Sequence, residues 1–207
     1  MRKALLHLKK ADPVLRQIIE RVGPCRIEYR DPVFSTLARA IVFQQLAGAA
    51  ATRIFERFQA LVDPSPLTAE AVLRLHLRKL RGAGLSLQKA TYLRDLSKKT
   101  VAAAIPFEHL PNLPDQEVID ALTQVKGIGV WTAHMFLIFA LRRPDVLPTG
   151  DYGIRAAMKK AYDLSDLPKP AEMERLAQPW RPYASVASWY LWQSLRKATA
   201  PPTTPAG

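Results

Sequence analysis

The 207-residue sequence has few cysteines, few acidic residues and no long hydrophobic run. Its one cysteine, Cys25, cannot form an internal disulfide, a four-cysteine zinc site or an iron–sulfur cluster, and it fits a reducing compartment. The longest apolar run, residues 135–141, is well short of a membrane span, and residues 4–6 are too short for a signal-peptide core. We therefore expect a cytoplasmic protein with no membrane partner, associated with the nucleoid if the source is bacterial.

The shortage of acidic residues leaves a strongly basic chain. Asp and Glu total 18 against 30 Lys and Arg, so the formal charge is +12 and the isoelectric point is about 10.1. A basic soluble protein usually meets a polyanion, and nucleic acid is the leading candidate. The alternative is a solubilising positive surface without a specific partner.

The hydrophobic pattern is helical and lacks a convincing strand period, so it predicts an all-α protein. We expect two helical lobes with a cleft between them. One lobe spans residues 33–110, and the other combines the amino-terminal helix in 1–32 with 111–199, leaving 200–207 as a frayed tail. Apolar spacing and turn residues place the main helices at about 34–48, 68–81, 86–104, 115–123, 130–142, 151–162, 171–179 and 184–197.

A short turn at Lys126, Gly127 and Gly129 joins two of these helices. The first amides of the second helix have no partner inside the helix and form its positive end, so a phosphate can bind there. Glycine allows positive φ and close backbone approach. Such contacts position a protein on DNA without reading sequence. The alternative is an ordinary corner between two helices.

A carboxylate follows this turn, after a buried helix and a loop with two prolines. Asp151 opens the next helix, where a helix N-terminus favours its negative charge. The plain interpretation is an N-cap, which is a common role for aspartate. An N-cap can also face a cleft, so both interpretations can hold together.

Residues 122–155 (LTQVKGIGVWTAHMFLIFALRRPDVLPTGDYGIR) resemble the helix–hairpin–helix and aspartate motif of the DNA glycosylase superfamily. Within it, the sequence is most similar to the 3-methyladenine DNA glycosylase II branch. Three further blocks resemble that branch: 34–53 (FSTLARAIVFQQLAGAAATR), 84–93 (GLSLQKATYL) and 180–192 (WRPYASVASWYLW). The chain begins close to its helical part, so we expect no amino-terminal β domain of the kind that bacterial relatives can carry.

The resemblance implies that Asp151 is the catalytic residue. Cleavage of an N-glycosidic bond leaves positive charge on the sugar, which a fixed carboxylate stabilises. The carboxylate can also orient or deprotonate the attacking water. An alkylated purine that carries positive charge is a good leaving group, so little acid catalysis is needed.

The resemblance also implies a base pocket and a reaction subtype. Trp131 stands where bifunctional relatives carry a nucleophilic lysine, which implies base removal without strand cleavage. Trp131, Met135 and Trp192 align with residues that line the pocket, where an aromatic ring attracts a cationic base by about 0.5–2 kcal/mol. Met135 replaces a tyrosine common in relatives. The alternative is that both tryptophans are core residues.

The remaining roles concern DNA. Leu87 matches a wedge that holds DNA bent and a nucleotide extruded, although it could be a core leucine. Gln45 is expected to contact the opened duplex, although it could be a buried polar residue. The resemblance assigns phosphate contacts to Lys126 and to the amides of Gly127, Gly129 and Thr132. It assigns a possible Na⁺ or K⁺ site to the main-chain carbonyls of Thr123, Val125 and Ile128, with no other cofactor required.

These features together imply a monofunctional DNA glycosylase that removes bases of the 3-methyladenine and 7-methylguanine type in base excision repair. We expect a monomer that acts on double-stranded DNA without a small-molecule cofactor. Two alternatives stay open. One is a non-catalytic DNA-binding or damage-sensing module. The other is a bifunctional glycosylase/lyase, which needs a nucleophilic lysine; Lys126 is nearby in sequence, but its place on the turn suggests that it faces a phosphate.

Overall fold

The computed structural model describes residues 1–46 and 48–196, and within them every regular element is a helix. The predicted all-α class is therefore confirmed. The chain divides into two compact units, one made of Met1–Ile27 and the segment from Pro144 onward, the other of Glu28–Arg143. No helix in the described part is long and apolar enough to cross a membrane. The tail predicted at 200–207 and the predicted helix end at 197 lie outside the described residues.

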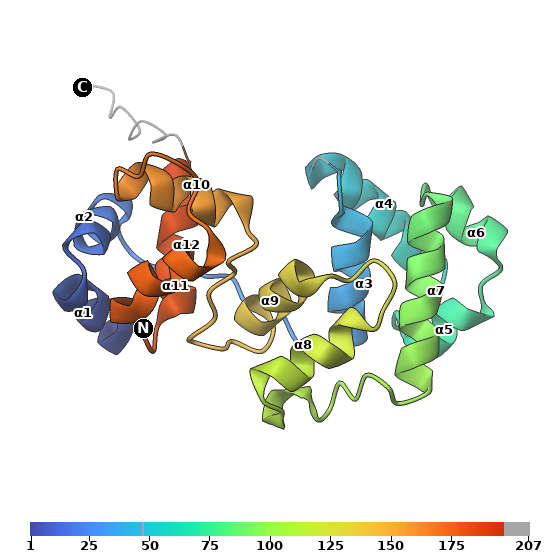
Figure 1. The fold of residues 1–207 in the computed structure, drawn as a ribbon. Coiled ribbons are helices and arrows are strands. Elements are labelled where there is room, and N and C mark those ends of the chain that lie inside the picture. The colour runs from blue at the N-terminus through green and yellow to red at the C-terminus, as the bar shows by residue number, and fades with distance from the viewer. Residues whose placement is uncertain (47, 197–207) are drawn as a thin grey trace, which may run out of the picture. The chain divides into compact units, whose positions relative to one another are not determined.

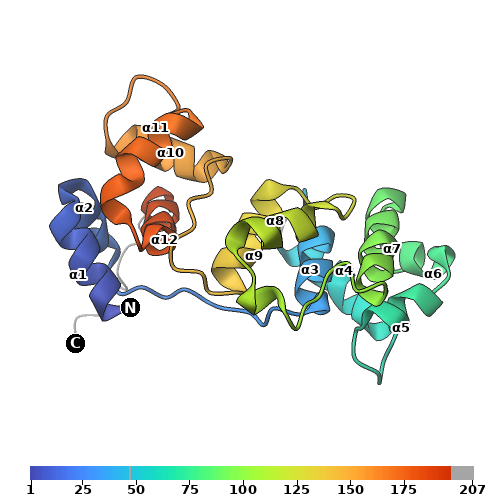
Figure 2. The same ribbon diagram turned by 60° about the horizontal axis from the view of Figure 1, so that its bottom comes forward.

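The first unit is built around its last helix. α12 (Ala184–Leu195) is buried along most of its length and packs against α2 (Pro13–Val22) and α10 (Tyr152–Ala161), as Figures 1 and 2 show. α1 (Arg2–Ala11), α11 (Pro170–Ala177) and the short 3₁₀ helix η2 (Gln178–Trp180) complete the unit. Burial of this apolar surface is the main force that holds the helices together.

Asp12 ties the amino-terminal helices to the rest of this unit. Its Oδ1 accepts hydrogen bonds from the Val14 and Leu15 amides at 2.8 and 3.0 Å, which caps α2. Its Oδ2 accepts from the Tyr162 hydroxyl at 2.5 Å and from the Trp180 indole nitrogen at 2.8 Å. One carboxylate therefore splits the amino-terminal region into two helices and anchors both.

The second unit contains seven α-helices within its described residues. α7 (Leu87–Val101) packs against α5 (Ala69–Arg74) and α3 (Phe34–Phe43), and Figure 1 shows the three side by side. The remaining elements are α4 (Gly48–Ala60), α6 (Leu77–Gly82), the 3₁₀ helix η1 (Leu110–Asn112), α8 (Asp115–Thr123) and α9 (Val130–Phe139).

The prediction of a single helix at 68–81 is wrong, because two helices, α5 and α6, occupy this segment. The chain leaves the helical conformation at Leu75 (ψ 130°), and the His76 ring nitrogen then accepts from the Arg78 amide at 3.2 Å. His76 thus caps a new helix, α6. Thr68 is the N-cap of α5, because its hydroxyl accepts from the Ala71 amide at 3.2 Å.

The division of the chain also differs from the expected lobes. Residues 111–143 were expected to join the amino-terminal helix, but they belong to the unit Glu28–Arg143. Hydrogen bonds over long sequence separations explain this grouping. They run from the Arg30 amide to the Phe139 carbonyl (2.8 Å), from the Gln44 side chain to the Gly127 carbonyl (2.7 Å), and from the Lys126 amide to the Asp95 carboxylate (2.9 Å).

Candidate nucleic-acid interface and catalytic carboxylate

The predicted hairpin is formed by α8, a tight turn and α9. Lys126, Gly127 and Gly129 are exposed on the turn, and Gly129 is the N-cap residue of α9 with no side-chain cap. Thr132 lies in the first turn of α9 and is buried. The amides of a helix's first turn have no carbonyl partner within the helix, so this end presents donors and positive potential. The geometry suits an anion such as a phosphate.

The two glycines of the turn differ in backbone conformation and in the space around them. Gly127 adopts φ +85°, in the left-handed region, whereas Gly129 has φ −100°, which any residue adopts. A Cβ at Gly127 would lie 2.1 Å from Cδ2 of Tyr92 on α7, whereas a Cβ at Gly129 would meet no atom within 4 Å. Gly127 is therefore required by packing within the protein, and only Gly129 leaves open space for an external group.

Asp95 fixes the start of the turn from α7. Its Oδ2 accepts from the Lys126 amide at 2.9 Å and from Lys99 Nζ at 2.7 Å. Burial opposes ionisation of Asp95, but these hydrogen bonds and the two lysine charges outweigh it and lower the pKa of the carboxyl. The Lys126 amide therefore has a partner inside the protein, while its exposed side chain extends the positive surface of the turn.

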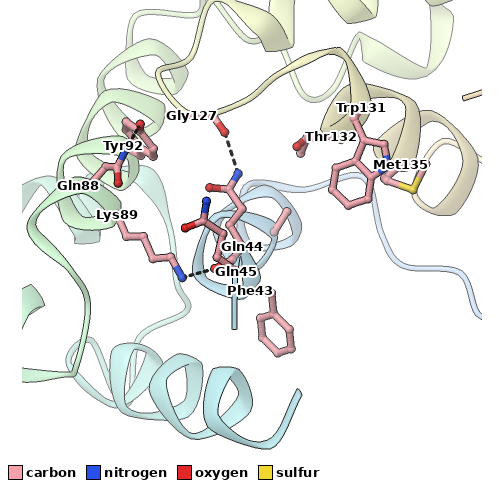
Figure 3. Close-up of a pocket in the computed structure, with 11 residues that line it drawn as sticks. Phe43, Gln44, Gln45, Gln88, Lys89, Tyr92, Gly127, Trp131, Thr132 and Met135 are labelled. Carbon is pink, nitrogen blue, oxygen red and sulfur yellow. Dashed lines mark hydrogen bonds between the residues drawn. The ribbon is translucent and has the colours of Figure 1, made fainter. Parts of the chain in front are cut away.

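A cavity of about 560 Å³ lies between the hairpin, the end of α3 and the start of α7. Figure 3 shows its lining, in which residues 131, 132 and 135 of α9 lie opposite the two glutamines that follow α3. The lining consists of Ala40, Phe43, Gln44, Gln45, Gln88, Lys89, Tyr92, Gly127, Trp131, Thr132 and Met135. Five residues predicted for DNA or base contact thus share one cavity.

The solvent exposure of Trp131, Leu87 and Gln45 excludes the alternative interpretation of each as a buried residue. Trp131 is 48% exposed and Leu87 is 53% exposed, so neither is a core residue. Gln45 is exposed as well, with φ 55°, so it is not a buried polar residue on its helix. Leu87 is the first residue of α7 and follows its N-cap Ser86, so it protrudes at the end of a rigid element.

Asp151 lies in the other unit, at the start of α10. It is 8% exposed, and its Oδ1 accepts from the Ile154 amide at 2.7 Å and from the Trp192 indole nitrogen at 2.9 Å. The N-cap interpretation is therefore confirmed. A Cβ at Gly153 would lie 3.1 Å from Oδ1 and 3.3 Å from the Trp192 ring, so a small residue keeps this arrangement closely packed.

Comparison with known proteins assigns the fold and motif to a family. The family described as HhH-GPD superfamily base excision DNA repair protein matches residues 38–182. This chain belongs to the HhH-GPD superfamily. It is 33% identical to DNA-3-methyladenine glycosylase 1 of Schizosaccharomyces pombe, over 95% of this chain and 88% of that protein. The predicted superfamily and the predicted alkylbase branch are both confirmed.

Solved structures of similar proteins agree with this assignment. The S. pombe 3-methyladenine DNA glycosylase Mag1, solved in complex with abasic DNA, superposes with a TM-score of 0.82 at 33% identity, covering 95% of this chain and 98% of that one. A DNA-3-methyladenine glycosidase from Bacillus halodurans gives 0.81 at 34% identity, covering 91% and 86%.

Some residues of the candidate site were missed from the sequence. Of the paired glutamines only Gln45 was singled out, yet Gln44 donates to the hairpin carbonyl of Gly127. Tyr92 and Lys89 were not assigned a role, although both line the cavity. Trp192 was assigned only to a base pocket, whereas its indole also binds the Asp151 carboxylate. None of these pairings follows from local spacing.

The carbonyls assigned to a monovalent cation lie where α8 meets the hairpin turn. Within the described residues, no group of three or more His, Cys, Asp and Glu side chains could hold a metal ion. The Val125 carbonyl already accepts from the Ile128 amide at 3.0 Å. A carbonyl oxygen has two lone pairs, so this bond is compatible with a second, cationic partner.

Proposed function

We propose that this HhH-GPD protein is a monofunctional DNA glycosylase that hydrolyses the N-glycosidic bond of alkylated bases in double-stranded DNA. The observation that carries the proposal is the state of Asp151. Its carboxylate is nearly buried and is held by two N–H donors at a helix N-terminus. A carboxylate fixed in this way needs no reorganisation when positive charge develops on the sugar.

The hydrogen bonds at Asp151 serve the reaction in two ways. Both donors, together with the positive end of α10, direct positive potential at the carboxylate oxygen. Both also act on Oδ1, which restricts rotation of the side chain. In the proposed reaction the ionised carboxylate stabilises the oxocarbenium-like sugar and orients the attacking water.

The proposed absence of lyase activity rests on position 131. An indole there offers no amine that could form a Schiff base with the sugar. Lys126, the alternative nucleophile, lies on the exposed hairpin turn, and we assign its side chain to a phosphate. The product is then an intact strand with an abasic site.

The remaining roles belong to the same proposal. The hairpin amides of Gly129 and Thr132, with Lys126, bind the phosphate backbone, and Leu87 enters the base stack. A sodium or potassium ion at the carbonyls of residues 123, 125 and 128 would strengthen the hairpin's positive charge. We propose that the protein acts as a monomer.

Asp151→Asn tests the proposal. Asparagine keeps an oxygen that can accept from Ile154 and Trp192, so the variant should fold and bind DNA while excision falls by about 10²–10³-fold. Asp145→Asn is the matched control, because Asp145 also accepts from a helix amide, that of Ala184 at 3.1 Å, in the same unit. It should excise at the wild-type rate.

The readout is base release from duplexes that each carry one defined lesion, with and without later alkali. Breaks that form only after alkali support the monofunctional reaction, and a covalent adduct trapped by borohydride would instead establish a lyase. Binding of damaged DNA without release by the wild type would favour the damage-sensing module. Near wild-type excision by Asp151→Asn would remove the catalytic assignment.

A further inference from the structure

Lys89 makes two main-chain contacts that have no part in the proposed chemical step. It is the third residue of α7, two positions after Leu87, and its side chain is half-buried. Its Nζ donates to the carbonyls of Val42 and Gln44 at 2.7 and 2.6 Å. Figure 3 shows the ammonium reaching the chain just after α3. The ammonium is partly withdrawn from water, and this burial lowers the pKa of Lys89.

The two acceptors lie at the carboxyl end of α3, which ends at Phe43. Carbonyls in the last turn of a helix lack partners within it, and a cation stabilises them and the negative end of the dipole. Gln45, which follows the second acceptor Gln44, has φ 55°. Residues other than glycine adopt this backbone conformation only when their surroundings enforce it. Lys89 therefore holds the main chain immediately before the strained residue Gln45.

The same segment is tied to the hairpin. The Gln44 side chain donates to the Gly127 carbonyl at 2.7 Å, so the residue whose carbonyl binds Lys89 also binds the turn. Tyr92, one helical turn after Lys89 on α7, packs directly against Gly127. The start of α7, the end of α3 and the hairpin turn are thus joined by one continuous run of contacts within one unit (Figure 3).

We propose that Lys89 is a positioning residue for nucleotide extrusion, holding Gln45 and the Leu87 wedge at a fixed distance from the hairpin. The inference rests on the proposed function. Unstacking a base is unfavourable, and a wedge can sustain it only if the wedge does not retreat. When the hairpin binds a phosphate, a rigid link to α7 sets where Leu87 meets the stack. Lys89 contacts neither substrate nor sugar in this assignment.

Lys89→Met tests the role, because methionine keeps the apolar stem and removes the ammonium. We expect single-turnover excision at saturating enzyme to slow by about 10–100-fold, the effect of losing hydrogen bonds from a charged donor. Fluorescence of 2-aminopurine placed next to the lesion, which rises on unstacking, should fall in parallel. Affinity for an undamaged duplex should stay within about 3-fold, since phosphate contacts are retained.

Arg143→Met is the matched control for a merely structural loss. Arg143 donates to the carbonyls of Pro111 and Leu113 at 2.9 and 2.6 Å, so it is another cation bound to two main-chain oxygens in the same unit. Those carbonyls lie just before the start of α8 rather than at the end of α3. The control should lower the melting temperature and leave the extrusion signal unchanged.

Restoring the charge provides a second test. In a Cys25→Ser background, Lys89→Cys treated with bromoethylamine regains an ammonium at nearly the length of lysine. We expect aminoethylation to recover most of the lost fluorescence and excision, and methylation of the same thiol to recover neither. Recovery with both reagents would mean that the stem rather than the charge matters and would overturn the proposal.

The outcomes separate this inference from the proposed function. If the wild type releases no alkylated base from any lesion duplex, the proposed function fails, while the 2-aminopurine comparison of wild type with Lys89→Met still decides the positioning role. If the wild type excises and Lys89→Met extrudes and excises equally well, the positioning role is wrong. The positioning role is also wrong if Arg143→Met, at the same loss of melting temperature as Lys89→Met, shows the same loss of the extrusion signal.

Discussion

Gly127→Ala should destabilise the protein, whereas Gly129→Ala should not, although the sequence gives both glycines the same role. The left-handed φ of Gly127 disfavours any residue with a Cβ by about 1–2 kcal/mol. The new Cβ would also lie 2.1 Å from Tyr92 Cδ2 and 2.3 Å from Cε2, so either the ring or the turn must shift. Overpacking of this kind adds about 1–3 kcal/mol.

The sum predicts a loss of about 2–5 kcal/mol for Gly127→Ala. Roughly 2–4 °C of melting temperature per kcal/mol applies to a chain of this size, so the midpoint should fall by at least about 4 °C. For Gly129→Ala no atom is met and φ is ordinary, so the change should stay within about 2 °C. Its affinity for duplex DNA should nevertheless fall if a phosphate approaches the amide of that residue.

A double-mutant cycle measures the overlap separately from the backbone strain. Tyr92→Ala removes the ring that the new Cβ would strike, so the Gly127→Ala/Tyr92→Ala variant should be more stable than the sum of the two single changes by roughly 1–3 kcal/mol. Strictly additive effects would show that Tyr92 does not dictate the glycine. A wild-type melting temperature for Gly127→Ala would refute the reasoning altogether.

Three further changes have defined outcomes. Trp192→Phe keeps the ring but removes the N–H that binds Asp151, so single-turnover excision should slow by roughly 10-fold, and an unchanged rate would show that the indole does not position the carboxylate. Asp12→Asn points an amide N–H₂ toward existing donors such as the Trp180 indole and should reduce stability by about 2–4 kcal/mol in thermal unfolding, with excision per folded molecule retained. Burial, with a smaller contribution from a neighbouring thiol, raises the pKa of Tyr190 to about 12 from 10.0. Since the folded state holds this proton more tightly, the associated stability is complete below pH 10 and is lost as the pH rises through 12, which alkaline unfolding of wild type and Tyr190→Phe would detect.

Local pattern in the sequence was enough to predict the all-α class, most of the helices, and the places of the hairpin turn and Asp151. Ser86, Thr68 and Asp151 each precede a helix and cap it, as residues with a short polar side chain are expected to do. The break within 68–81 was missed because Leu75 and His76 carry no strong turn signal. The histidine cap there depends on a ring nitrogen rather than on the common hydroxyl or carboxylate.

Contacts between distant segments could not be predicted in the same way. Lys89 binds carbonyls 47 and 45 positions earlier, and Trp192 binds a carboxylate 41 positions earlier. Main-chain acceptors leave no trace in residue identity, so no inspection of the sequence would have paired Lys89 with the end of α3. Because such contacts cannot be predicted from the sequence, the hairpin was assigned to the lobe of the amino-terminal helix, although it belongs to the unit Glu28–Arg143.

The two units divide the proposed chemistry by the kind of rigidity that each requires. In the unit Glu28–Arg143, main-chain carbonyls are held by Lys89 and Gln44, which suits a surface that must resist the restacking of DNA. In the other unit, a single carboxylate is held by one amide and one indole, which suits a group that must keep its charge and orientation. Loss of a donor in the first unit should therefore impair extrusion before chemistry, and loss of a donor at Asp151 should impair chemistry after normal extrusion. Fluorescence of an extruded base and single-turnover excision, measured on the same variants, distinguish these two failures.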